Sequence, residues 1–105
     1  LAPLLVSPAM AKTSAPPGAT KEEIEMGRKG AESIEKNKNV KLLDEKDPKN
    51  KPLLDKLNAM VKMLGKASDR PKVEYSVKVI VEDDINAFTL PAGRIYITTG
   101  LIEAA

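Results

Sequence analysis

The sequence predicts an α+β fold in which two helices pack on a small, mainly antiparallel sheet with a C-terminal β-hairpin. Residues 53–64 carry apolar side chains at intervals of three and four, the spacing of one helix face. Residues 73–82 alternate apolar and polar side chains, as a half-buried strand does. Residues 86–90 and 94–98 are β-rich and flank a Pro-Ala-Gly turn, which is typical of a hairpin.

Composition indicates one domain with an aliphatic core. The chain has 105 residues, of which 42% are hydrophobic but only 3% are aromatic. Its net charge of +2 comes from 17 basic and 15 acidic residues, so the surface is mixed. We find no basic stripe of the kind that binds nucleic acid, and no phosphate loop or acid–base pair.

The chain contains no Cys and no His. This excludes disulfides, thiolate metal sites, imidazole zinc ligands and His-dependent nucleophiles within these residues. We therefore predict no catalytic residue and no metal ligand in this chain.

The first 19 residues have the composition of a leader and a linker. Residues 1–11 form an apolar run that ends in Ala-Met-Ala, the small-x-small form of a signal-peptidase site. We interpret them as the end of a clipped signal peptide, which predicts a secreted or periplasmic protein. The alternative is a disordered apolar arm, and the run is too short to span a bilayer. Residues 12–19 are expected to be a Pro- and Gly-containing linker before a domain at residues 20–105.

The first helix is predicted over residues 21–36. Thr20 and Glu23 have the spacing of a capping box. The apolar face is narrow and includes Gly27 and Ala31, which indicates close packing on a neighbouring element.

The second helix is predicted to begin at Asp47-Pro48, with Asp as N-cap, and to end near Gly65 or Ser68. The following strand should be covered by helices on one face. We expect the helix to contact that strand through the apolar sets Leu53, Leu57, Met60, Val61 and Leu64 on the helix, and Tyr75, Val77, Val79 and Val81 on the strand.

The chain around the hairpin offers little acid–base chemistry of its own. Asp83 and Asp84 are neighbours that point to opposite faces of an extended chain, so we interpret them as a solvated turn. Residues 101–105 have the composition of a helix start, and the domain is expected to be incomplete at that point.

The hairpin segment I-N-A-F-T-L-P-A-G-R-I-Y-I-T-T-G-L-I resembles the segment before the zinc helix of HtpX-like and CAAX-prenyl-protease-like metallopeptidases. That family runs N-A-F-A-x-P-G-G-x-I-x-V-x-x-G-L-L, followed by a helix with H-E-x-x-H. Thr89 stands where Ala is usual, and Ala92 replaces the first Gly of the pair. Residues 23–31 are similar to the family's first helix, so the resemblance covers most of residues 20–105.

The resemblance implies a role for the first strand of the hairpin. In zinc peptidases of the HtpX-like and thermolysin-like kinds, this strand is the edge over the catalytic cleft, and an extended peptide or protein substrate adds to it as a further strand. Asn86, Ala87 and Phe88 are the substrate-binding residues implied here, with Asn86 able to reach a substrate carbonyl or amide. The alternative is an ordinary hairpin with Phe88 in the core.

Two functions are compatible with these residues. The resemblance implies the N-terminal part of a secreted or periplasmic zinc metalloendopeptidase, whose zinc ligands would follow Ala105. Zinc is then the cofactor of the parent protein and not of this chain, and membrane association of the parent is an open alternative. The second function is a small non-catalytic domain that binds or inhibits peptides with the same edge strand.

Overall fold

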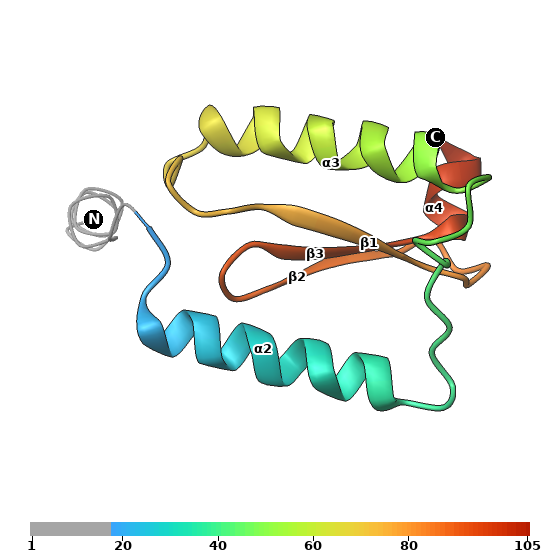
Figure 1. Cartoon of the computed structure of the whole chain (residues 1–105), viewed down its shortest axis with the longest axis horizontal. Helices are drawn as coiled ribbons and strands as arrows, with labels where there is room; N and C mark the ends of the chain where they lie inside the picture. The colour runs from blue at the N-terminus through green and yellow to red at the C-terminus, as the bar shows by residue number, and fades with distance from the viewer. Residues whose placement is uncertain (1–17) are drawn as a thin grey trace, which may run out of the picture.

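The computed structural model describes residues 18–105. The predicted signal peptide and most of the predicted linker lie outside the described residues. In chain order, the elements are helices α2 (Lys21–Lys36) and α3 (Lys51–Lys66), strands β1 (Ser76–Ile80), β2 (Ala87–Leu90) and β3 (Arg94–Thr98), and the short helix α4 (Thr99–Ala104). Figure 1 shows the sheet between α2 and α3.

The three strands form one sheet with the order β1-β3-β2. The predicted hairpin is confirmed, because β2 pairs antiparallel with β3. β1 pairs parallel with β3, so the sheet is mixed and not mainly antiparallel. The connection from β1 to the hairpin crosses one end of the sheet, and β2 and not β3 then occupies the outer position.

Helices cover both faces of the sheet, and the prediction of cover on one face is wrong (Figure 1). Ile80, which breaks the alternation of its strand, is 8% exposed and packs on the α2 side with Ala31 and Tyr96. Partly buried apolar side chains complete this cluster: Ile34, Val40, Leu42 and Leu90. Ile80, the apolar residue that breaks the alternation of β1, therefore packs in the layer between the sheet and α2.

α2 has the predicted bounds and the predicted cap. The Thr20 hydroxyl accepts the Glu23 N–H at 3.1 Å, and the Glu23 carboxylate accepts the Thr20 N–H at 2.9 Å. Close packing is confirmed as well. A Cβ on Gly27 would overlap the carbonyl oxygen of Pro91 in the hairpin turn, and Ala31 is only 3% exposed. Small side chains thus let the helix backbone rest on the hairpin.

α3 begins later than predicted. Its N-cap is Asn50, and the proline of its first turn is Pro52. Asp47 lies in the preceding turn, where its carboxylate accepts the Lys49 N–H at 3.0 Å. The Asp-Pro pair therefore makes a turn that ends before the helix, because the Asp side chain satisfies a turn amide.

The contact face of α3 also differs from the prediction. Leu54 and Gly65 are buried, whereas Met60 and Leu64 are 48% and 67% exposed. A Cβ on Gly65 would overlap the ring of Tyr75, so the helix approaches the strand through a glycine. Val77 and Val79 lie in the core as expected, but Val81 follows the end of β1 and is 40% exposed.

An ion pair joins the start of α2 to the loop after α3. Two nitrogens of Arg70 bind the two oxygens of Glu23 at 2.6 and 2.7 Å, and Arg70 also donates to the Gly18 carbonyl at 2.7 Å. The hydrogen bonds from Arg70, followed by the one from the Thr20 backbone, lower the pKa of Glu23 from 4.5 to about 2. The charged carboxylate is therefore favoured by the folded state.

Replacing this carboxylate should change how stability depends on pH. Because the folded pKa of Glu23 is lowered, its contribution is complete above pH 4.5 and is lost as the pH falls toward about 2. We expect Glu23→Gln to be less stable than the parent at neutral pH, with the difference shrinking over that acidic range. Urea unfolding at a series of pH values measures it.

Glu22→Gln is the matched control, since it removes the same charge from the same turn and Glu22 makes no ion pair within residues 18–105. A Glu23→Gln deficit that stays constant from neutral pH to pH 2 would contradict the assignment.

Candidate functional site

β2 is one of the two outer strands of the sheet, and its residues are exposed up to Thr89. The Thr98 N–H donates to the Asn86 carbonyl at 3.1 Å, so these two residues form a hydrogen-bonded pair at the start of the ladder. Pairs of this kind alternate along antiparallel strands. Phe88 therefore directs its backbone groups to β3, whereas Ala87 and Thr89 direct theirs to the open edge.

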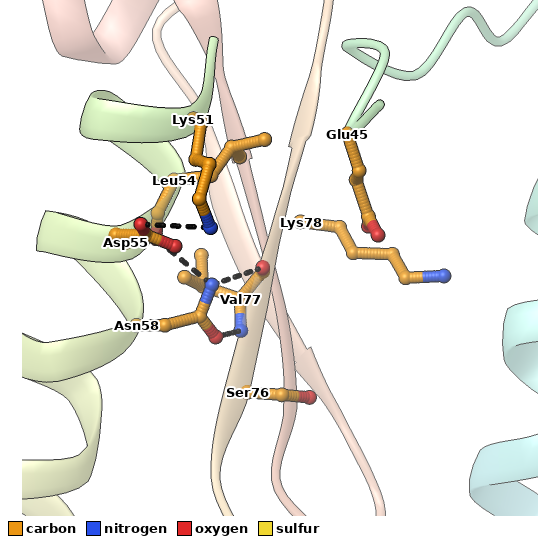
Figure 2. A pocket seen from close by; sticks show the side chains of 8 residues that line it. All are labelled: Glu45, Lys51, Leu54, Asp55, Asn58, Ser76, Val77 and Lys78. Atoms are coloured by element: carbon orange, nitrogen blue, oxygen red, sulfur yellow. Dashed lines mark hydrogen bonds and ion pairs between the residues drawn. The ribbon is translucent and has the colours of Figure 1, made fainter. Parts of the chain in front are cut away.

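The opposite edge of the sheet is closed. The Asn58 side chain accepts the Val77 N–H at 3.0 Å and donates to the Val77 carbonyl at 3.4 Å (Figure 2). Further along, residues 41–43 bind the same edge, because the Leu43 N–H donates to Val79 and the Val81 N–H donates to Lys41. Within the part of the chain that the structure describes, the β2 edge is thus the one available to an added strand.

Thr98 fixes the point at which the chain enters β2. This residue is 3% exposed. Its hydroxyl accepts the Asn86 N–H at 3.1 Å and the Leu101 N–H at 3.2 Å. The same hydroxyl can donate its proton to the carbonyl of Asp84 or to that of Asn86. A single side chain therefore links the loop before β2, the end of β3 and the first turn of α4.

The next two residues hold the same loop more tightly. The Thr99 hydroxyl accepts the Glu82 N–H at 3.0 Å and donates to the Glu82 carbonyl at 2.9 Å. A Cβ on Gly100 would overlap the backbone of Asp83 and Asp84. The T-T-G segment thus positions the whole entry to the edge strand.

Phe88 supports the strand from the α2 side. Its ring stacks on Tyr96 with centroids 5.3 Å apart and an interplanar angle of 16°. Tyr96 is 1% exposed, and burial raises the pKa of its hydroxyl. Phe88 itself is 36% exposed, so it covers the core from outside and is not enclosed by it.

The hairpin turn contains two consecutive residues with positive φ. Ala92 has φ 70° and Gly93 has φ 80°. Glycine adopts this conformation freely, whereas for alanine the left-handed region costs about 1–2 kcal/mol. Ala92 therefore stores strain at the tip that joins β2 to β3.

The three residues predicted to bind substrate are consecutive, with Asn86 just before β2 and the other two in it, but they do not point in one direction. Asn86 begins the ladder with its exposed side chain, the backbone of Ala87 faces the open edge, and the ring of Phe88 lies on the α2 face. The prediction omitted Thr89, the second residue whose backbone faces outward, and Thr98. Ladder alternation identifies Thr89 once the partner strand is known, whereas no sequence pattern singles out the Thr98 hydroxyl.

The described residues do not supply a metal site. Residues 18–105 contain no group of three or more His, Cys, Asp or Glu side chains placed to hold one ion. In the same range, no helix has the length and hydropathy needed to cross a bilayer.

The Thr98 hydroxyl should be important for stability. Thr98→Val keeps the shape but leaves the amides of Asn86 and Leu101 without their acceptor, at a cost of about 2–3 kcal/mol. Urea unfolding measures the loss. Thr89→Val makes the same substitution at an exposed position of the hairpin and should be nearly neutral. Equal effects of the two substitutions would contradict this role.

Comparison with known protein families gives a match in the C-terminal half of the chain. Residues 52–105 match the sequence model of Peptidase family M48, a span that starts in α3 and includes the whole sheet and α4. No curated protein matches the chain. The matched span covers just over half of the sequence and contains the edge strand, the hairpin turn and the T-T-G segment. The chain therefore belongs to peptidase family M48.

Proposed function

We propose that this chain supplies the substrate-binding edge strand of a zinc-dependent metalloendopeptidase of the HtpX-like or CAAX-prenyl-protease-like kind. The single observation that carries the proposal is the open edge of β2 beside a closed β1 edge. Exposed backbone groups of Ala87 and Thr89 are the groups that an extended peptide would use to add a strand.

Main-chain recognition has a clear chemical consequence. The outward N–H and C=O of Ala87 and Thr89 lie two residues apart, so a peptide can pair with them in registers that differ by two residues. The side chains of that peptide alternate between the two faces of the sheet. The strand thereby binds a broad range of sequences and holds one peptide bond at a fixed height, without any covalent step by these residues.

The residues of this chain do not fit zinc. There is no His or Cys in the sequence, and residues 18–105 hold no cluster of metal-binding side chains. Family M48 is generally zinc-dependent, so zinc in the parent protein is an inference from the family. We assign its ligands and the general base to a part of the parent protein outside residues 1–105.

The partly covered α3 face of the sheet supports an incomplete domain. Ile95 and Ile97 pair with Val77 and Val79 and share their α3 side. α3 packs on β1 (Figure 1). The two isoleucines remain only half-buried, and Met60 and Leu64 of α3 are exposed as well. A further helix of the peptidase domain would bury this surface.

Residues 1–11, which resemble the end of a signal peptide, support a proposal for the location of the parent protein. We propose that the parent protein is secreted or periplasmic, with membrane association as the alternative.

A second function, a non-catalytic domain that binds or inhibits peptides, uses the same edge strand. It is favoured by the complete ladder of β2, which requires no further residues to accept a strand.

A proline at position 87 separates edge binding from folding. The Ala87 N–H faces outward, so Ala87→Pro removes a donor for the peptide without breaking the β2–β3 ladder. We expect the affinity for the peptide to fall about tenfold, because one intermolecular hydrogen bond is lost and proline restricts the backbone at this position. Titration with an extended peptide, followed by amide NMR, measures it.

Ala87→Ser keeps the amide and should bind like the parent. Phe88→Pro removes a ladder donor and should destabilise the fold instead. Unchanged peptide affinity in Ala87→Pro would argue against the edge strand as the binding site.

Zinc content and cleavage distinguish the two functions. Residues 1–105 alone should bind no stoichiometric zinc and cleave no peptide, because they lack the ligands. A longer protein that carries H-E-x-x-H should gain both, and its Asn86→Ala variant should lose turnover while zinc content is unchanged. Zinc-dependent cleavage by residues 1–105 would overturn the proposal, and a stop codon after Ala105 would favour the non-catalytic domain.

A further inference from the structure

A concave surface lies apart from the β2 edge, because no residue of β2 lines it. It is a cavity of about 1110 Å³ between the start of α2, the end of α3, the approach to β1 and the hairpin turn. We call it the basic groove; its charged side chains and its aromatic ring are those of Lys62, Lys66, Lys72, Glu74, Arg94 and Tyr75. β1 and the hairpin turn separate it from the open edge of β2.

The charge of the groove is strongly one-sided. Four basic side chains line it against the single carboxylate of Glu74. None of the four takes part in the ion pairs found within residues 18–105, all of which lie elsewhere. The three lysines are exposed and Arg94 is half-buried. Uncompensated charges around a concavity reinforce one another and attract anions.

Helix stability does not account for this arrangement. Lys66 lies in the last turn of α3, where a cation is favoured by the helix dipole. Lys72 lies in the loop that follows, and Arg94 begins β3, so neither gains from that dipole. The smaller cavity of about 330 Å³ along the same β1 edge provides a contrast, because its lining balances Lys51 and Lys78 with two carboxylates (Figure 2).

The size and floor of the groove indicate the kind of ligand. Its volume exceeds the roughly 300–1,000 Å³ typical of small-molecule sites. The lining also contains the apolar side chains of Ile24 and Val73 and the Tyr75 ring, which we call the floor; Ile24 is 51% exposed. A hollow with basic walls and an apolar floor fits a chain segment better than a flat membrane surface. The groove offers one aromatic ring, which is too few for stacking on successive bases.

We propose that the basic groove binds an acidic polypeptide segment of a partner protein, with Asp and Glu side chains against the four cations and one apolar side chain on the floor. The proposal does not rest on peptidase activity, since the groove and the β2 edge are separate surfaces.

Peptide binding to the full chain tests this directly. The probe is a fluorescein-labelled peptide of Asp and Glu with one central Leu, measured by anisotropy against its Asn/Gln counterpart. We expect binding of the acidic peptide alone. Raising the ionic strength from about 0.01 to 0.15 M, which shortens the Debye length from about 30 to 8 Å, should weaken it.

The double substitution Lys62→Gln/Lys66→Gln should weaken binding about tenfold, as expected for two partly screened charge contacts. Lys49→Gln/Lys56→Gln removes the same charge from exposed positions outside the groove and should leave the affinity unchanged. Equal losses of affinity in the two double variants would show that the peptide responds only to the net charge of the chain, and would overturn the proposal.

Three further measurements test for other kinds of ligand. Binding of the Asn/Gln peptide with the same affinity would overturn the requirement for acidic side chains. Tighter binding to phosphatidylserine vesicles than to the peptide would assign the groove to a membrane surface. Displacement of the peptide by inorganic phosphate at equal concentration would assign it to a small anion.

Discussion

The pairing of β3 on both sides is the constraint on which the rest of the structure depends. β3 pairs in parallel with β1 and antiparallel with β2, so every backbone group of the central strand is used inside the sheet. The open hydrogen-bonding capacity is thereby confined to the two outer strands. Asn58 and residues 41–43 close one of them, and within residues 18–105 the β2 edge keeps backbone groups that no strand pairs with.

Local signals predicted the elements well, and contacts distant in sequence decided what they missed. The capping box at Thr20 and Glu23 and the small face of α2 specify that helix completely, since their partners lie within one turn or on one surface. The signals that predict the hairpin are equally local, because its turn residues lie directly between its two strands. The parallel pairing of β1 could not be read from its own residues, because an alternating strand is compatible with either direction.

The contact face of α3 shows a second limit of periodicity. Counting apolar side chains favours the stripe with Met60 and Leu64, yet the helix approaches the sheet through Asn58 and Gly65. Asn58 lies there because it satisfies a strand edge, and Gly65 because only a residue without Cβ leaves room for the Tyr75 ring. At Asn58 the need to hydrogen-bond a strand edge, and at Gly65 the space needed by a ring, decided the contact face more than hydropathy did.

The candidate site was predictable in outline. The resemblance implies Asn86, Ala87 and Phe88 as substrate-binding residues, which stays a prediction; Asn86 directly precedes β2, and Ala87 and Phe88 lie in it. Which backbone groups face outward depends on the ladder with β3 and could not be assigned beforehand. The support from Thr98 arises from a fold that brings residues 84–86 next to the end of β3, a proximity that no short motif encodes.

The Thr98 hydroxyl carries one proton but lies within reach of two carbonyls, those of Asp84 and Asn86. The two acceptors therefore compete, and the proton can pass from one to the other by rotation about a single bond. When it binds Asp84, the Asn86 carbonyl keeps its ladder bond from the Thr98 N–H; when it binds Asn86, the preceding loop is still held by Thr99 and Gly100. Rotation of this one hydroxyl therefore leaves the entry to the edge strand attached to the end of β3 in either case.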